Sequence, residues 1–306
     1  MLEVSNVNKR KNMNFNLQRV IKKNISGWTL MAPTLILFAF FIWEPLLQSI
    51  RLSLYSAQGI RTIKFVGLQN YIDVYHHPDF MPAVMNTFAY TIWSLVIGFL
   101  APLILAIIIN EMVHAKSFFR LGIYFPSVVP GLATVLMWGF IYRPGGTGVL
   151  NILLSKIGMD PMVWLSNPKL TIPLIVVSMT WKGAGATALI YLASLQGINL
   201  ELYEAALIDG ASIWHRIRYV TIPGMKNLIS TLLILQVIAV FQILYEPLVM
   251  TNGGPNDASI SIMQLVFKYA FEKFDYPKAA AVSVIISIFL ITLTLIYNKI
   301  NKPQDV

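Results

Sequence analysis

Six apolar runs, each long enough to cross a lipid bilayer, constrain this chain more than any other feature of its sequence. The hydrocarbon core of a bilayer is about 30 Å thick, so a helix needs roughly 20 apolar residues to span it. Runs of this length occur at 28–50, 83–110, 118–142, 170–195, 228–250 and 279–297. Because a helix satisfies its own backbone hydrogen bonds in lipid, the sequence predicts an all-α, polytopic membrane protein with six transmembrane helices.

Composition supports a membrane protein and argues against a soluble enzyme. Of the 306 residues, 56% are hydrophobic and 12% are charged, whereas soluble domains average about 25% charged residues. The net charge is +9, but the basic residues lie mainly between the apolar runs, where they meet lipid headgroups or set topology. Membrane lipid is therefore the expected partner of these charges, and nucleic acid is not.

The basic N-terminus predicts the orientation of the chain. The first 24 residues hold one acid, Glu3, and six bases: Lys9, Arg10, Lys11, Arg19, Lys22 and Lys23. Positive segments stay in the cytoplasm, and six spans return the C-terminus to the same side. The first apolar run is too long for a cleaved signal peptide, so it is expected to remain as a span. The predicted organisation is a cytoplasmic basic tail at 1–25, a transmembrane domain at 26–300 and a cytoplasmic tail at 301–306.

The sequence lacks the motifs of catalysis and of nucleotide binding. There is no G-x-x-x-x-G-K-[ST] phosphate loop, no H-E-x-x-H pair and no G-x-S-x-G elbow. The absence of cysteine excludes a disulfide, a thiolate metal site and a cysteine nucleophile. We therefore expect no catalytic residue, no metal site and no cofactor in this chain.

A polar segment between the fourth and fifth runs, 201–227, has the pattern of two helices joined by a glycine. Good helix formers run to Asp209, and Gly210 suits the left-handed residue that ends a helix. Ser212 can cap a second helix, and Pro223 suits the first turn of the next span.

Two roles remain open for this segment from its residues alone. Ala205 and Ala206 leave one face of the first helix narrow, so that a partner's groove can approach while Glu204 and Asp209 offer charge. Alternatively, the segment is an amphipathic helix that lies on the lipid headgroups.

Glu204-Ala205-Ala206, followed by Gly210 and by Val220 to Pro223, resembles the EAA loop of binding-protein-dependent ABC importer permeases. The resemblance implies a cytoplasmic coupling loop, 199–224, that docks on an ATPase. The residues that it assigns to this contact are Glu204, Ala205, Ala206, Asp209, Gly210 and Pro223.

Further segments resemble the carbohydrate-uptake branch of that family, the group similar to the large membrane subunit of the maltose importer. They are FVGLQNY at 65–71, Asn86-Thr87, Trp181-Lys182-Gly183, 192–198 and TNGGP at 251–255. The chain lacks the extra N-terminal spans and the long outer insertion of that subunit, so its docking contacts are not carried over.

The resemblance implies a non-catalytic permease subunit in the bacterial cytoplasmic membrane, with both termini cytoplasmic. It would move a carbohydrate inward by alternating access, with an oligosaccharide favoured over a monosaccharide or polyol phosphate. The implied partners are a second, homologous permease, two ATP-binding subunits that hold ATP and Mg, and an extracytoplasmic solute-binding protein. An ion-coupled secondary transporter is the alternative, although such proteins often show inverted repeats, which this sequence does not.

Polar residues inside the predicted spans are candidates for the transport pathway. Such residues are costly in lipid and normally face the interior of a bundle. Lys182 lies near the middle of the fourth run, and Gln242, Tyr245 and Glu246 share one face of a continuous helix at i, i+3 and i+4. A structural role, as a buried Lys182–Glu246 pair or as interhelix hydrogen bonds, fits these residues equally well.

Two further expectations concern helix shape and packing. Pro102, Pro126 and Pro130 should kink or interrupt the second and third spans. The outer segment 258–274 has apolar residues at helical spacing, which favours packing at the mouth of the pathway and also allows contact with the binding protein.

Overall fold

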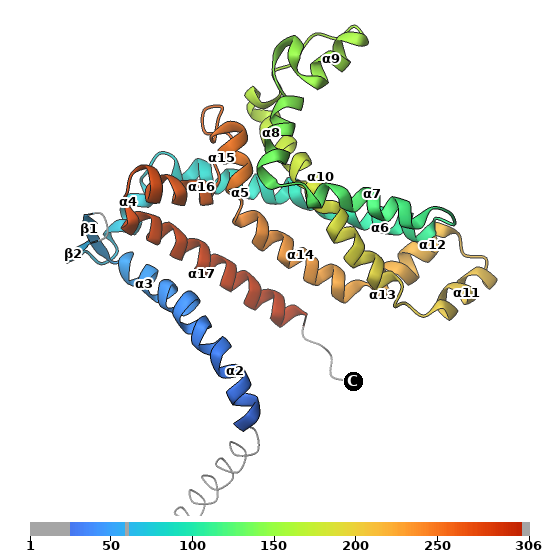
Figure 1. Cartoon of the computed structure of the whole chain (residues 1–306), viewed down its shortest axis with the longest axis horizontal. Coiled ribbons are helices and arrows are strands. Elements are labelled where there is room, and N and C mark those ends of the chain that lie inside the picture. The colour runs from blue at the N-terminus through green and yellow to red at the C-terminus, as the bar shows by residue number, and fades with distance from the viewer. Residues whose placement is uncertain (1–24, 59–60, 302–306) are drawn as a thin grey trace, which may run out of the picture.

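The structure is a computed structural model and describes residues 25–58 and 61–301 (Figure 1). Apart from its last residue, the predicted basic tail lies outside the described residues, with all six of its Lys and Arg residues. The same is true of 302–306 in the predicted C-terminal tail.

Four of the six predicted spans are long, nearly continuous helices. They are Gly27–Leu52, Phe80–Glu111, Pro168–Leu195 and Tyr276–Ile300, and each is long and apolar enough to cross a membrane. The elements are α2 (Ile25–Phe38), η1 (Ala39–Trp43) and α3 (Glu44–Leu52), then α5 (Phe80–Trp93), η2 (Ser94–Phe99) and α6 (Leu100–Glu111), and finally α10 (Pro168–Leu195) and α17 (Tyr276–Ile300). These helices confirm the all-α class and the first, second, fourth and sixth predicted spans.

The third predicted span is a pair of helices with a sharp bend. α7 (Lys116–Val128) and α8 (Gly131–Ile141) meet at 96°. The break falls before Pro130, which lacks an N–H and disfavours a helical conformation in the preceding residue. Val129 accordingly adopts an extended conformation with φ −64° and ψ 132°. The predicted interruption at Pro130 is confirmed, whereas Pro126 lies inside α7 without ending it.

The fifth predicted span differs from the expectation of one continuous helix. α14 (Lys226–Phe241) ends at Phe241, with Gln242 as its C-cap, and a separate helix, α15 (Tyr245–Thr251), follows. Pro247 cannot donate to the carbonyl of Ile243, and the hydroxyl of Ser261 donates to it instead at 2.6 Å. The prediction that Gln242, Tyr245 and Glu246 share one helical face is therefore wrong, because the helix ends between the first and second of them.

Three of the π turns stand just before a proline. η1 precedes Pro45, η2 precedes Pro102, and η5 (Ile217–Thr221) precedes Pro223. A proline cannot bond to the carbonyl four residues earlier and its ring crowds that carbonyl, so a wider turn accommodates it. Pro102 therefore changes the hydrogen bonding of the second span without ending the span.

Short elements lie at both ends of the bundle. At one, the hairpin end, the strands β1 (Tyr55–Gln58) and β2 (Arg61–Phe65) form an antiparallel hairpin that no sequence pattern predicted. The connections on this side also hold α4 (Gln69–Tyr75), α16 (Ile262–Phe267) and η6 (Lys268–Glu272). The connection between α8 and α10 projects separately (Figure 1) and holds η3 (Gly145–Thr147), α9 (Val149–Lys156) and η4 (Trp164–Ser166). The opposite, coupling-loop end holds α11 (Leu200–Ile208), α12 (Ile213–Arg216), η5 and α13 (Ile222–Gly224).

The fourth span, α10, is the packing centre of the bundle. It lies against α6, α7 and η2, and a Cβ added at Gly185 would overlap the backbone of Ile123 and Tyr124 in α7. Its buried side chains Ile175, Val176, Tyr191 and Leu192 pack in clusters with side chains of neighbouring spans, among them Tyr90 and Val240. The close approach at Gly185 makes α7 and α10 a tightly packed pair.

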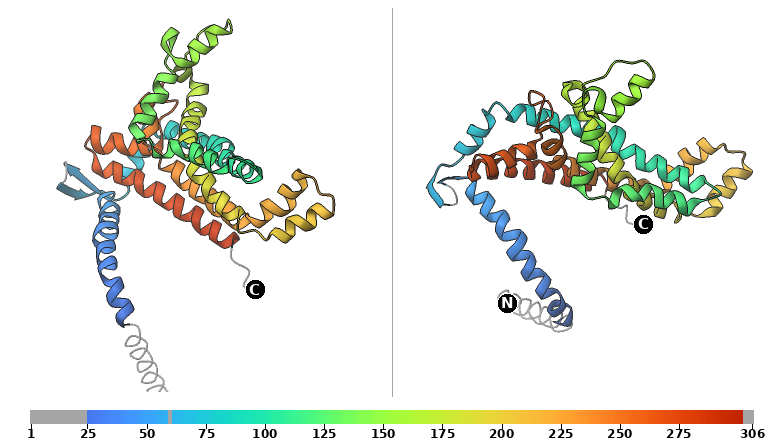
Figure 2. Two further views of the ribbon diagram at one scale, coloured as in Figure 1. Left: turned by 45° about the vertical axis from the view of Figure 1, so that its right-hand side comes forward. Right: turned by 45° about the horizontal axis from the view of Figure 1, so that its top comes forward.

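The first span stands apart from this bundle. Its most apolar part has no residue buried in the described structure. α3 contacts α17, and α2 then diverges from the other helices in each view (Figures 1 and 2). An apolar helix of this length needs lipid or another membrane chain as its surroundings.

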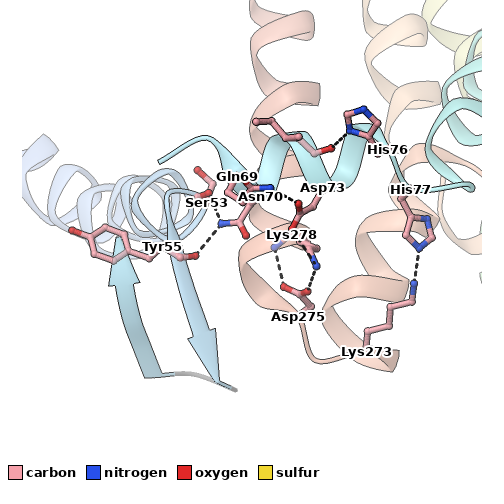
Figure 3. Close-up of polar contacts among 11 residues, drawn as sticks. Ser53, Tyr55, Gln69, Asn70, Asp73, His76, His77, Lys273, Asp275 and Lys278 are labelled. Carbon is pink, nitrogen blue, oxygen red and sulfur yellow. Dashed lines mark hydrogen bonds and ion pairs between the residues drawn. The ribbon is translucent and has the colours of Figure 1, made fainter. Parts of the chain in front are cut away.

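A polar cluster joins the hairpin end to the start of α17 (Figure 3). Lys278 lies 3.7 Å from the carboxylate of Asp73 and 3.1 Å from that of Asp275. The buried amide of Asn70 donates to the carbonyls of Ser53 and Tyr55 at 2.8 and 2.9 Å. These bonds fix the hairpin and α4 against the last span.

Candidate coupling loop and transport pathway

The first helix of the coupling loop ends in a Schellman motif. Gly210 has φ +75°. The N–H of Ala211 donates to the carbonyl of Ala206 at 2.8 Å, and that of Gly210 donates to Leu207 at 3.0 Å. At the other end of α11, the side chain of Asn199 accepts from the N–H of Glu201 at 3.1 Å. The predicted helix that stops at Gly210 is confirmed.

The second helix of the loop includes Pro223. Ser212 caps it, as expected, by accepting from the N–H of His215, and the helix runs from Ile213 to Gly224 before a bend of 72° leads into α14. Pro223 was predicted to open the next span, and this is wrong. It lies in the last turn of the loop helix, because the π turn η5 gives its ring room without ending the helix.

A bond between the two helices fixes the shape of the loop. The hydroxyl of Tyr203 on α11 lies 2.9 Å from that of the buried Thr221. Sequence reasoning missed both residues, since no local pattern shows that positions 18 apart will meet. With one helix end closed by Gly210 and the helices joined by this bond, the loop is a preformed elbow.

The residues assigned to ATPase contact lie mostly on the surface of this elbow. Glu204, Ala205, Asp209, Gly210 and Pro223 are exposed and Ala206 is half-buried. The described ion pairs do not include Glu204 or Asp209, and α11 projects from the bundle (Figure 1). The two carboxylates are thus available to another molecule.

A groove separates α11 from the ends of the second and fourth spans. Its volume is about 420 Å³, and its lining includes Glu111, Tyr203, Glu204 and Arg216. The Nε atom of Arg216 is buried and has no hydrogen-bond partner among the described residues. Neither Arg216 nor Glu111 was among the residues assigned to the ATPase contact from the sequence.

Lys182 and Tyr245 each adjoin the break between α7 and α8. The ammonium group of Lys182 donates to the carbonyl of Val129 at 2.6 Å, and a Cβ added at Gly131 would lie 3.7 Å from the Tyr245 ring. No described ion pair joins Lys182 to Glu246. Of the two structural alternatives, the interhelix hydrogen bond is the one observed.

The other two pathway candidates differ in their exposure. Glu246 is half-buried in the first turn of α15, while Gln242 is exposed at the end of α14. Gln242 makes no described side-chain contact with the break at Val129.

A polar cavity that sequence reasoning missed lies between the second, fourth and fifth spans. Its volume is about 160 Å³, and the polar side chains that line it are Ser94, Thr180, Thr187 and Gln236. The amide of Gln236 donates to Ser94 at 2.6 Å. Gly98 leaves this space open, since a Cβ there would come within 3.0 to 3.3 Å of Ser94, Gln236 and Thr180.

One signal in the sequence pointed to this cavity. Gln236 is an amide inside an apolar run, and such residues normally face a bundle interior. Its partners come from two other spans, however, and sequence spacing does not show which faces meet.

Two motifs noted separately in the sequence contact one another at the hairpin end. Asn86 donates to the carbonyls of Asp257 and Ile260 at 2.6 and 3.1 Å, and Thr87 accepts from the N–H of Ile262 at 3.0 Å. The second span thereby holds the segment that follows the TNGGP turn and leads into α16. The packing role expected for 258–274 is confirmed by the burial of Ile260 and Leu265.

Comparison with known proteins identifies the family. Residues 98–303 match the model of the binding-protein-dependent transport system inner membrane component. The probable ABC transporter permease protein YurN of Bacillus subtilis is 31% identical over 288 residues, covering 92% of this chain and 98% of that protein. The trehalose/maltose transport system permease protein MalF of Thermococcus litoralis is 32% identical over 280 residues, covering 90% of this chain and 93% of that protein.

A solved structure has the same fold over almost the whole chain. It is a bacterial alginate ABC transporter in complex with alginate pentasaccharide-bound periplasmic protein, and one of its chains matches with a TM-score of 0.83 and 25% identity. The match covers 94% of this chain and 97% of that chain. The protein therefore belongs to the inner membrane components of binding-protein-dependent transport systems, the permease subunits of ABC importers.

Proposed function

We propose that this permease subunit carries a carbohydrate into the cytoplasm by alternating access, driven by ATP hydrolysis in partner subunits. The observation that carries the proposal is the preformed elbow with its free carboxylates at Glu204 and Asp209. Because the sequence has no phosphate loop, movement made by a nucleotide-binding partner must enter through a rigid contact of this kind.

The proposed docking surface consists of Glu204, Ala205, Ala206, Asp209, Gly210 and Pro223. The small side chains at Ala205 and Ala206 allow a partner's groove to approach α11, and Glu204 would pair with a basic residue there. ATP and Mg belong to the two ATP-binding subunits, and this chain needs no cofactor of its own. The coupling-loop end then faces the cytoplasm, as do both termini, in a bacterial cytoplasmic membrane.

The exposed first span supports a second permease as a further partner. An apolar helix without buried residues can pack against another membrane chain as well as against lipid. We assign this role to a homologous permease subunit, with the solute-binding protein at the hairpin end.

The polar cavity and the α7–α8 break are the proposed lining of the pathway. Hydroxyl-rich solutes need donors and acceptors, which Ser94, Thr180 and Gln236 supply, and an aromatic face, which Tyr245 offers. Relatives named for trehalose and maltose or solved with an alginate pentasaccharide support a sugar, and an oligosaccharide in particular.

The test is the ATPase activity of the purified complex, with its ATP-binding subunits and solute-binding protein, in lipid nanodiscs. Glu204→Gln should remove most of the increase in ATP hydrolysis that the sugar-loaded binding protein causes, because the coupling contact loses its charge. The matched control is Glu201→Gln, which alters an exposed acid in the first turn of the same helix. Equal stimulation in the Glu204→Gln and control complexes would refute the coupling role.

A further inference from the structure

Lys182 and the end of α7 are joined by two reciprocal hydrogen bonds. The ammonium group of Lys182, midway along α10, donates to the carbonyl of Val129 at 2.6 Å. In the opposite direction, the hydroxyl of Ser127 donates to the carbonyl of Lys182 at 2.9 Å. Two bonds at one place define the relative position of the two helices more closely than one bond does.

The Val129 carbonyl lies at the interruption of the third span, where no backbone N–H of a continuing helix is present to bond to it. The next residue is Pro130, which has no N–H, and α8 does not begin until Gly131. The last carbonyls of a helix lack intrahelical partners and carry partial negative charge, which a cation stabilises. In the interior of a membrane, an unpaired carbonyl would cost free energy. The Lys182 ammonium thus replaces the missing backbone donor.

The bend that follows positions one wall of the proposed pathway. α7 is held on α10 by the close approach at Gly185, so Lys182 ties the bend to a firmly packed pair of helices. α8 turns from α7 by 96° and packs against both α10 and α15. The Trp138 ring of α8 contacts the Trp181 ring of α10, and Gly131 adjoins the Tyr245 ring. A change at the bend would therefore move α8 and Tyr245 together.

We infer that Lys182 is a positioning residue and is not a ligand of the transported solute. By donating to the Val129 carbonyl at the end of α7, it sets the angle between α7 and α8. The inference rests on the proposed function for its effect on transport, but the helix angle can be measured without any transport. The two ideas can thus fail separately.

The absence of cysteine makes a distance measurement straightforward. Spin labels can be attached at Leu136→Cys in α8 and at Ile190→Cys in α10, since the native side chains are 59% and 48% exposed, respectively. Pulsed electron paramagnetic resonance then measures the distance between the labels in the assembled complex, and this distance reports the orientation of α8. Lys182→Met keeps the length of the side chain without the charge. Because Lys182→Met loses a hydrogen bond from a charged group, we expect α8 to adopt a second orientation more often. The population of molecules with a second label-to-label distance should rise about tenfold. Lys182→Arg should restore the parent distribution.

The matched control is Lys169→Met, which removes an exposed lysine from the first turn of the same helix and should leave the distances unchanged. An unaltered distribution in Lys182→Met would overturn the inference. If the Lys182→Met complex does not assemble, Ser127→Ala removes the reciprocal bond alone, and it should give a smaller broadening. An unchanged distribution in Ser127→Ala would then overturn the inference.

Uptake kinetics separate positioning from ligand binding. With Lys182→Met, kcat should fall about tenfold while KM for the sugar-loaded binding protein stays within about twofold, and Lys182→Arg should recover most of kcat. Loss of sugar affinity with the parent distance distribution would show that Lys182 is a ligand and would overturn the inference. If the parent complex shows no ATP-driven uptake, the proposed function fails, whereas the distance measurement still decides the role of Lys182.

Discussion

Gly98, Gly185 and Gly210 occupy positions where a larger side chain would act in three different ways. At Gly98 a Cβ would press on the polar groups of the cavity, and at Gly185 it would overlap the backbone of α7. At Gly210 there is open space, but φ is +75°, so the cost of a side chain comes from the backbone conformation. The absence of a side chain therefore matters for the cavity at Gly98, for helix packing at Gly185 and for the end of α11 at Gly210.

Gly98→Ala should reduce transport through the cavity. The new methyl group would stand 3.0 to 3.3 Å from Ser94, Gln236 and Thr180, so the Gln236 amide must shift and the cavity becomes smaller. We expect uptake at low sugar concentration to fall about tenfold in proteoliposomes, with a stability loss of about 1 to 3 kcal/mol from overpacking. Gly139→Ala is the control, since a Cβ there meets nothing within 4 Å. Equal uptake by the two variants would contradict a pathway role for the cavity.

Gly210→Ala should weaken the coupling contact through the backbone alone. A non-glycine residue in the left-handed conformation costs about 1 kcal/mol, so the end of α11 should fray and sugar-stimulated ATPase activity should fall severalfold. Gly158→Ala carries the same kind of penalty at φ +76°, also with nothing within 4 Å, but it lies far from the loop in sequence and on the opposite side of the predicted membrane. A similar loss of stimulation in both variants would mean that general destabilisation, and not the elbow, is responsible.

At the scale of helices and strands, the sequence predicted those features that depend on local patterns. Span length located four long helices, Pro130 located one break, and Gly210 with Ser212 located the elbow. The end of α14 was missed because it depends on Ser261, which bonds to Ile243 from 18 residues away. The cavity was missed for a related reason, as its polar groups come from three spans. Local patterns thus define the elements, whereas contacts between distant segments define the candidate pathway.

The cluster at the hairpin end should make stability depend on pH through His77. Burial lowers the pKa of His77 from its usual value near 6.5, and the nearby Lys273 lowers it further, against the opposing effect of Asp79. Lys268 and Lys278 act in the same direction as Lys273. Because the pKa is lower in the folded protein, neutral His77 contributes stability above pH 6.5, and this is lost as pH falls through the folded value.

Thermal unfolding of the purified complex between pH 7.5 and 5.5 tests this dependence. The melting temperature should fall toward pH 5.5 by more in the parent than in His77→Gln, which cannot be protonated. His76→Gln is the control, since it changes the adjacent exposed histidine. An identical pH dependence in the parent and in His77→Gln would show that the Lys273–His77 contact at 2.9 Å does not contribute.

At the scale of the whole molecule, α10 and α14 link the elbow to the candidate pathway, one at each end of the loop. α10 runs from η4 past Lys182 and the cavity to the start of the coupling loop, and α14 returns from that loop to the cavity through Gln236. Movement of the elbow would therefore be transmitted along two rigid spans to the polar groups between them. The first span lies outside this arrangement (Figure 2), which fits a role in contact with lipid or a second permease.

The central claim is that this chain depends on ATP hydrolysed elsewhere. Its most direct test is uptake of radiolabelled sugar into proteoliposomes that contain either the chain alone or the complete complex, with ATP and Mg inside or outside the vesicles. We predict uptake by the complete complex with ATP on the coupling-loop side, and none by the chain alone. Sugar accumulation by the chain alone, at the rate of the complete complex and without ATP, would contradict the account.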